Sequence, residues 1–169
     1  MKLEHHPTHD FMDASKTTRF QECPRAFFFE YILGSRKKGS STHIDYGSAI
    51  HKGMEVLCKD GYSVKNAGRA YVAFRDELTS LLTPFELSEL PPNKTLEKAK
   101  ECFLGYIKTY PSDKLETLHV EVPFEVMIAD SMSMRGKIDW IVRDDKGKVW
   151  AVDHKTAGSL SVSWKNQFT

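Results

Sequence analysis

The apolar pattern of the chain changes period at Pro111, and this change limits the folds that the chain can adopt. Before Pro111, apolar residues recur at the spacing of an α-helix. They predict helices over about 15–33, 46–61, 65–82 and 95–110. After Pro111, the segments LETLHVEVPFEVMI, SMRGKIDWIVR and KVWAVDHKT are rich in β-branched and aromatic residues and predict three consecutive strands. Helices followed by an antiparallel meander indicate an α/β or α+β domain.

The N-terminal region is expected to begin with a flexible, histidine-rich lead-in over residues 1–14. Ser15 can cap the first helix, and Pro24 predicts a kink or a break within it. Four apolar side chains at helical spacing are expected to be mostly core: Phe27, Phe28, Tyr31 and Ile32. The segment TPFELSELPPNK is expected to be a connection rich in turn residues. A further helix is expected after the third strand, from Ser161.

The composition permits one domain with a hydrophobic core, since the 169 residues are 40% hydrophobic and 28% charged. The net charge of +1 gives no support of its own for a nucleic-acid partner. Cys23, Cys58 and Cys102 form no CxxC pair, so we expect buried thiols and neither a disulfide framework nor a self-contained zinc site. No segment approaches the roughly 18 apolar residues of a membrane helix. The protein is expected to be cytoplasmic, with no membrane partner.

The segment RDDKGK between the second and third strands carries a hairpin signal. A three-residue loop, Asp145 to Gly147, needs its glycine in the left-handed conformation. This loop places Asp139 opposite Asp153, and alternation then puts Lys155 on the same face of the sheet. A two-residue loop would shift the register by one residue and separate them. The opposite face is expected to be hydrophobic and covered, and it consists of Ile138, Trp140, Val142, Trp150 and Val152.

Two carboxylates that face each other repel unless a cation lies between them, and Mg²⁺ prefers carboxylate oxygen as a ligand. A lysine two residues from one of these carboxylates can hold or deprotonate a water beside the metal. Asp139, Asp153 and Lys155 therefore form a candidate site for metal-assisted hydrolysis. The alternative is an ordinary surface salt bridge between aspartate and lysine on an exposed sheet face.

The order of these motifs resembles the PD-(D/E)XK nuclease superfamily. GKIDW and VDHKT supply the catalytic hairpin, and SKTTRFQECPRAFFFEYIL, GSAIHKGMEVL and VEVPFEV precede it in the order found in that superfamily. Within that superfamily, the sequence most resembles the branch that contains the RecB nuclease domain, the AddB subunit and the CRISPR adaptation nucleases. It covers the chain from Ser15 to Gln167.

The resemblance implies an α/β fold with a restriction-endonuclease-like core, in which helices flank a central mixed sheet behind an N-terminal helical region. One nuclease domain would span residues 15–169, with its helical part over about 15–110 and its catalytic strands over about 115–156. The start of the following helix would lie at 161–169. Gln167 matches the first residue of a Q-x-x-x-Y motif, but the sequence stops at Thr169, so we expect the C-terminal part of the core to be missing.

The resemblance also implies the site residues. His51, Asp139 and Asp153 would bind Mg²⁺ or Mn²⁺, together with the main-chain carbonyl of His154. Lys155 would be the catalytic lysine, and Glu121 would assist from the neighbouring strand. Without the resemblance, His51 would be interpreted as a satisfied histidine at the edge of a helix face.

Some relatives in this branch carry an iron–sulfur cluster, and Cys23 matches its first ligand. The other three cysteine ligands follow the nuclease core in those relatives and have no counterpart in this sequence. An iron–sulfur cluster is therefore not expected in this chain.

The function expected from the resemblance is a metal-dependent deoxyribonuclease, and more specifically an exonuclease of DNA recombination, repair or phage DNA processing. DNA would be the substrate, bound with the help of Arg19, Arg25 and Gln167, and a helicase or another recombination protein would be a partner. One alternative is a catalytically silent nuclease-fold subunit that binds DNA or a partner. A third hypothesis, a hydrolase of small phosphoesters, would need phosphate-cradling glycines that the strand-to-helix junctions do not supply.

Overall fold

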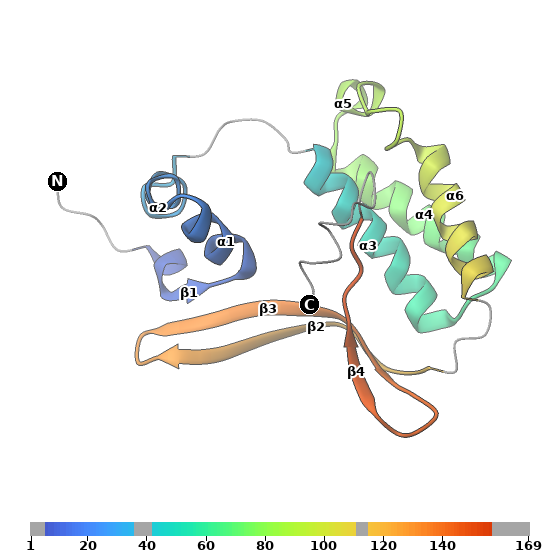
Figure 1. The fold of residues 1–169 in the computed structure, drawn as a ribbon. Helices are drawn as coiled ribbons and strands as arrows, with labels where there is room; N and C mark the ends of the chain where they lie inside the picture. Colours follow the sequence, from blue (N-terminus) through green and yellow to red (C-terminus); the bar gives the residue numbers. More distant parts are fainter. Residues whose placement is uncertain (1–5, 36–41, 111–114, 157–169) are drawn as a thin grey trace. The chain divides into compact units, whose positions relative to one another are not determined.

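The computed structural model describes residues 6–35, 42–110 and 115–156, which form two compact units (Figure 1). The first unit consists of Met1–Gly39 and Glu121–Ile138, and the second consists of Ser40–Val120 and Asp139–Thr169. Strands β2 (Glu116–Ala129) and β3 (Met132–Arg143) continue from one unit into the other. Each unit is therefore built from segments that are far apart in the sequence.

The four strands form a mixed sheet in the order β1-β3-β2, with β4 (Val149–Val152) also paired with β3. Strand β1 (Phe11–Met12) runs parallel to β3, and β4 runs antiparallel to it. The expected α/β fold class, a mixed sheet with helices, is confirmed. No helix in the described part of the chain has the length and apolar character needed to cross a membrane.

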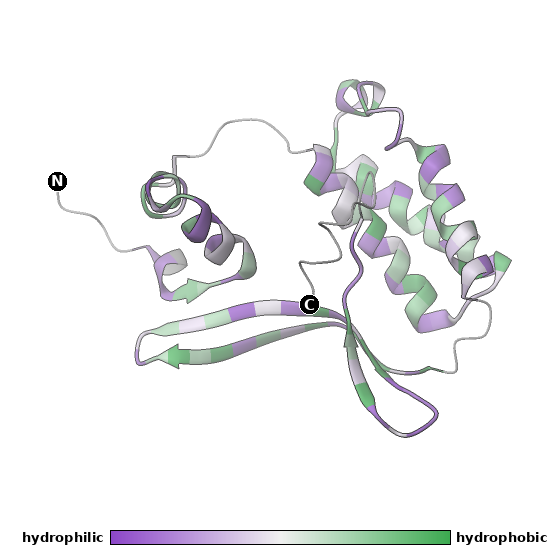
Figure 2. Ribbon diagram, viewed as in Figure 1, coloured by the Kyte–Doolittle hydropathy of each residue, from purple (hydrophilic) through white to green (hydrophobic). Residues whose placement is uncertain are grey.

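Three long helices share the main hydrophobic core of the second unit. They are α3 (Thr42–Asp60), α4 (Val64–Leu81) and α6 (Leu96–Thr109), and they lie side by side in Figure 1. Hydrophobic and hydrophilic residues are interleaved along them, as Figure 2 shows. The predicted apolar face of α3 is confirmed, since its four members are buried: Ile50, Met54, Leu57 and Cys58. Helix α3 begins at Thr42, earlier than the sequence predicted.

The three helices pack closely because Gly53 carries no side chain. A Cβ atom at Gly53 would overlap the ring of Phe103 on α6 and would lie 2.8 Å from the carbonyl oxygen of Ala70 on α4. Phe103 itself is fully buried, at 0% exposure. Gly53 therefore sets the distance at which α3 meets its two neighbours.

The connection before α6 contains a short helix, α5 (Pro84–Ser88), where only turns were expected. Thr83 caps this helix through a capping box. Its hydroxyl accepts a hydrogen bond from the amide of Glu86, and the carboxylate of Glu86 accepts one from the amide of Thr83. The sequence carried the signal for this helix in TPFE.

The predicted hairpin register is confirmed. Ile141 pairs with Ala151 in the β3–β4 ladder, and the amide of Asp144 donates to the carbonyl of Lys148 at 2.9 Å. Gly147 adopts the required left-handed conformation, with φ of 80°. The ladder ends at Val152, so the expected pair of Asp139 and Asp153 lies just beyond its last pair.

The expected hydrophobic face of the hairpin is buried in part. Trp140 and Val142 are buried beside Cys58 of α3, and Val152 packs against them. Trp150 does not join them and is 45% exposed, so its expected burial is wrong. Its indole N–H donates to the carboxylate of Asp144 at 2.9 Å, which holds the ring at the turn.

The first unit differs from the expected flexible lead-in. Residues Pro7–Asp10 form the 3-10 helix η1, and β1 follows with Phe11 paired to Ser133 of β3. The side chain of Lys16 is buried because its ammonium donates to the carbonyl of Phe11 at 2.8 Å and lies 3.5 Å from the centre of the Phe11 ring. These contacts tie β1 to the helix that follows it.

The predicted break at Pro24 is confirmed. Helix α1 (Ala14–Glu22) ends there, and α2 (Pro24–Phe27) leads directly into η2 (Phe28–Ile32), a π-helix. Asp13 caps α1, since its side chain accepts a hydrogen bond from the amide of Lys16. The prediction that Ser15 is the cap is therefore wrong. Gly34 follows with φ of 66°.

Several expected core residues of the helical regions are not buried. Neither α2 nor η2 has a buried residue, and Phe28 is 36% exposed. Cys23 is exposed because it caps α2, with its sulfur accepting from the amide of Ala26. Cys102 is also exposed, since α6 turns Ala99 and Phe103 into the core instead. Burial of a cysteine is therefore confirmed for Cys58 alone among the three.

Candidate metal centre

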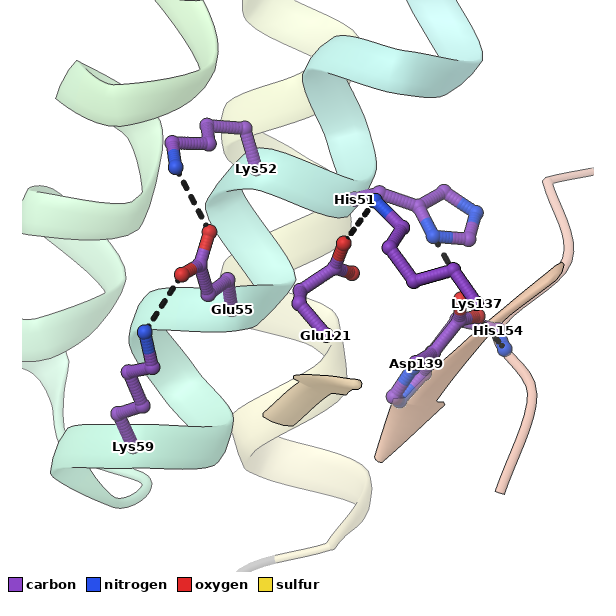
Figure 3. A network of polar contacts seen from close by, with 8 residues as sticks. All are labelled: His51, Lys52, Glu55, Lys59, Glu121, Lys137, Asp139 and His154. Carbon is purple, nitrogen blue, oxygen red and sulfur yellow. Dashed lines mark hydrogen bonds and ion pairs between the residues drawn. The ribbon is translucent and has the colours of Figure 1, made fainter. Parts of the chain in front are cut away.

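His51 and Asp139 meet between helix α3 and strand β3 of the second unit (Figure 3). His51 follows the buried Ile50, so its ring projects from the edge of the apolar face of α3. Its Nδ1 atom lies 3.3 Å from Oδ2 of Asp139, and the two side chains are 25% and 10% exposed. The structure thus brings together two of the predicted metal ligands.

The main chain after β4 holds the carboxylate of Asp139. The amide of His154 donates to Oδ2 of Asp139 at 2.8 Å. This oxygen is the same one that faces His51. Asp139 is therefore oriented from two sides, by an imidazole on a helix and by an amide that follows a strand.

The pair of His51 and Asp139 fits a divalent cation. Their ligand atoms lie within 4.8 Å of each other, so one ion can contact both. Imidazole nitrogen and carboxylate oxygen are both common metal ligands. A carboxylate as buried as Asp139 also needs compensation for its charge, and a bound cation would supply it beside the hydrogen bond from the amide of His154. The donor set suits a divalent metal ion.

Asp153 and Lys155 form a second, more exposed pair. The ammonium of Lys155 lies 2.8 Å from Oδ1 of Asp153, and the side chains are 49% and 52% exposed. Within the described ranges, the ligand atoms of Asp153, His51 and Asp139 do not all lie within 4.8 Å of one another. Asp153 follows the last ladder residue, so the register alone does not fix its side chain, and Lys155 neutralises its charge.

Glu121 is the first residue of the β2 segment that belongs to the first unit. It adopts a positive φ of 57°, which is uncommon for a residue with a side chain and is often found at functional sites. Its carboxylate forms an ion pair with Lys137 of β3 (Figure 3). The sequence motifs do not mark Lys137, although its place two residues before Asp139 is a usable signal. The assisting role of Glu121 stays a prediction.

The surface of α3 beside His51 carries a separate ion network. Glu55 accepts from the ammonium groups of Lys52 and Lys59 at 2.8 and 2.6 Å (Figure 3). These two lysines lower the pKa of the Glu55 carboxyl. The charge of the Glu55 carboxylate is therefore balanced by two lysines of its own helix, so Glu55 is not a candidate metal ligand.

The predicted DNA-binding residues differ in their surroundings. Arg19 is bound by Glu30 at 2.7 Å and by Glu22 at 3.6 Å, and its hydrogen bond to Glu30 raises its pKa. Arg25 forms no ion pair within residues 6–35, 42–110 and 115–156, and it lies 5.9 Å from the centre of the Phe29 ring. Gln167 and the helix expected from Ser161 lie outside the described residues.

The chain matches the model of a known protein family. The model of a family described as the PD-(D/E)XK nuclease superfamily matches residues 13–168. A search of curated proteins found none that matches the chain. The matched range includes every site residue predicted from the sequence.

Proposed function

We propose, from the premise that this chain belongs to the PD-(D/E)XK nuclease superfamily, that it is a Mg²⁺- or Mn²⁺-dependent deoxyribonuclease. Proteins of this superfamily are generally nucleases, which implies DNA as the substrate. The observation that carries the proposal is the contact between His51 and the nearly buried carboxylate of Asp139. A nitrogen donor from α3 and an oxygen donor from β3 converge there, and β3 belongs to the hairpin that also carries VDHKT.

His51 and Asp139 would hold the metal ion, and Asp153 and the main-chain carbonyl of His154 would complete the protein ligands. A divalent cation bound there lowers the pKa of water and polarises a phosphoryl oxygen. Asp153 would have to turn from Lys155 toward Asp139, and its exposed position permits this.

Lys155 would hold the attacking water and stabilise the negative charge that develops on the water oxygen. Its ammonium now donates to Asp153, so these two groups already share one charge-assisted hydrogen bond. Glu121 would assist as a further carboxylate. Its ion pair with Lys137 balances its charge in the first unit.

The mode of action that we propose is exonucleolytic, in DNA recombination, repair or phage DNA processing. The RecB-like motif order supports it, and a helicase or another recombination protein would then be a partner. Arg25 supports a contact with the DNA backbone, since no carboxylate in the described part of the chain binds it. Arg19 is a weaker candidate because Glu30 and Glu22 already bind it.

The alternative is a catalytically silent subunit that binds DNA or a partner protein. The observation that favours it is the separation of Asp153 from the other two ligands. The presence of His51, Asp139, Asp153 and Lys155 together favours catalysis.

Degradation of end-labelled DNA separates these two functions. Linear and circular DNA, single- and double-stranded, would be incubated with Mg²⁺, Mn²⁺ or EDTA. We expect metal-dependent loss of linear DNA, with circular DNA intact, and a loss of rate of about 10²- to 10⁴-fold in Lys155→Ala, the usual size of an acid–base contribution.

The matched control is Lys146→Ala, which removes an exposed lysine from the hairpin loop of the same unit. It should cut DNA at the wild-type rate. Cutting of circular DNA would show an endonuclease. Full activity of Lys155→Ala would refute the catalytic role of this lysine, and binding of DNA without cutting by folded wild type would establish the silent subunit.

A further inference from the structure

The side chain of His154 lies between two aromatic rings of the second unit. Its ring is stacked on Trp140, with centroids 6.0 Å apart and planes inclined by 23°. Tyr106 of α6 meets it edge-on, with centroids 6.1 Å apart. Trp140 is itself only 3% exposed. The imidazole of His154 is therefore packed against a fixed surface.

Trp140 is tied to the helix that carries His51. Its indole N–H donates to the hydroxyl of Thr117 on β2 at 3.1 Å. That hydroxyl in turn donates to the carbonyl of Cys58 on α3 at 2.8 Å. The ring against which His154 stacks is thus held, through Thr117, by the main chain of α3.

The main chain of His154 contacts the candidate metal ligand directly. Its amide donates to Oδ2 of Asp139 at 2.8 Å. The β3–β4 ladder ends at Val152, so ladder hydrogen bonds do not hold His154 in place. The stacking of its ring on Trp140 supplies a restraint at the position where the ladder stops.

We propose that the side chain of His154 is a positioning residue, which acts through its stack on Trp140 to hold its own amide against Asp139. This amide keeps the carboxylate of Asp139 aimed toward the position shared with His51. The inference rests on the proposed function, because it concerns the orientation of that same site. The ring acts by its shape, so a phenyl ring should replace it.

Titration calorimetry with Mn²⁺ tests the inference without any need for catalysis. The proteins would be wild type, His154→Ala, His154→Phe and the control His119→Ala, which removes an exposed histidine from β2. Loss of a group that orients a ligand typically weakens metal binding by about 10- to 100-fold. We expect a loss in that range for His154→Ala and near wild-type binding for the other two variants.

The outcomes distinguish this inference from the proposed function. No binding of Mn²⁺ by wild type would contradict the proposed metal centre itself. Binding by wild type with equal binding by His154→Ala would overturn the positioning role alone. If His154→Phe binds as weakly as His154→Ala, the imidazole acts through its nitrogens and the stacking argument is wrong.

A second variant keeps the test decisive if His154→Ala does not fold. Thr117→Val preserves the volume of the side chain but removes the hydroxyl that joins Trp140 to Cys58. Thermal unfolding would establish that the variant is folded. Weaker Mn²⁺ binding supports the inference, and unchanged binding overturns it.

Discussion

Asp144 forms several hydrogen bonds through one carboxylate at the hairpin turn. Its oxygens accept from the amides of Lys146 and Lys148 and from the indole of Trp150. The bond from Trp150 is the largest cause of the lowered pKa of its carboxyl, followed by the bond from the amide of Lys148. A turn that determines which residues face each other thus depends on an ionised side chain.

We expect Asp144→Ala to lower the unfolding temperature, because three donors lose their acceptor. A carboxyl with a lowered folded-state pKa contributes stability above its unfolded pKa, which is about 4. That contribution is lost as the pH falls through the folded-state pKa. Urea unfolding of wild type and variant from about pH 7 downward should therefore converge in acid.

The control is Asp145→Ala, in the same loop. Asp145 is exposed, and no hydrogen bond of its side chain is found in the described structure. Its removal should leave the difference between neutral and acidic pH unchanged. An equal effect of the two substitutions would show that loop charge, and not the bonds of Asp144, stabilises the turn.

At the residue scale, the sequence predicted backbone register better than side-chain exposure. The resemblance to the superfamily implied that His51 and Asp139 belong to one site, and the structure shows these two side chains in contact. Alternation along the strands predicted which residues share a sheet face, and the role of His51 and Asp139 as metal ligands stays a prediction. The sequence did not predict the exposure of Trp150, and it offered the salt bridge of Asp153 with Lys155 only as the alternative to a metal site. Both depend on side-chain rotamers at or beyond the end of a ladder, where the backbone register no longer fixes a direction.

At the element scale, Gly53 controls the packing of three helices. We expect Gly53→Ala to destabilise the protein by about 1–3 kcal/mol, the usual cost of an overpacked core. The added methyl group would overlap Phe103 and crowd the carbonyl of Ala70. Urea unfolding followed by circular dichroism measures this change.

Gly68→Ala is the matched control. Gly68 lies inside α4, and a Cβ atom there meets nothing within 4 Å. Alanine has the higher helix propensity, so this variant should be more stable by about 0.5–1 kcal/mol. Similar effects of the two substitutions, in sign and size, would contradict the close packing at Gly53.

Elements with a strong periodic pattern were predictable from the sequence, and elements defined by distant contacts were not. The helices α3, α4 and α6 and the hairpin of β3 and β4 matched their predicted segments. Strand β1 was not predicted, because its two residues form a strand only by pairing with β3. The π-helix η2 was not predicted either, since its aromatic residues are compatible with an ordinary α-helix.

At the scale of the whole molecule, metal binding should stabilise the fold. A ligand that binds only the folded state adds about 2.7 kcal/mol when its concentration is 100 times its dissociation constant. We expect Mn²⁺ to raise the unfolding temperature of wild type and EDTA to reverse the rise. In Asp139→Asn, the amide oxygen can still accept from His154, but the charge that attracts the ion is gone.

Asp139→Asn should therefore fold with an unfolding temperature equal to or above that of metal-free wild type, and it should not respond to Mn²⁺. Differential scanning fluorimetry measures both quantities. A rise with Mn²⁺ in the variant equal to that in wild type would place the stabilising ion elsewhere on the chain.

The contacts divide the chain into two compact units, and the single nuclease domain behind a lead-in stays a prediction. This division crosses β2 and β3, each of which is continuous in sequence. Local sequence patterns report on residues that are close along the chain. They do not show that one strand has its first residues in one unit and its last residues in the other. The family match spans segments of both units.

The parallel pairing of Phe11 with Ser133 has a consequence for how the protein is made. During synthesis, the segment that contains α3, α4 and α6 leaves the ribosome as one piece, and its helices can pack as soon as they emerge. The N-terminal strand β1 cannot form its pairing until β3 has been translated. Until then β1 has no partner strand, so the first unit can complete its sheet only after the helices of the second unit have been synthesised.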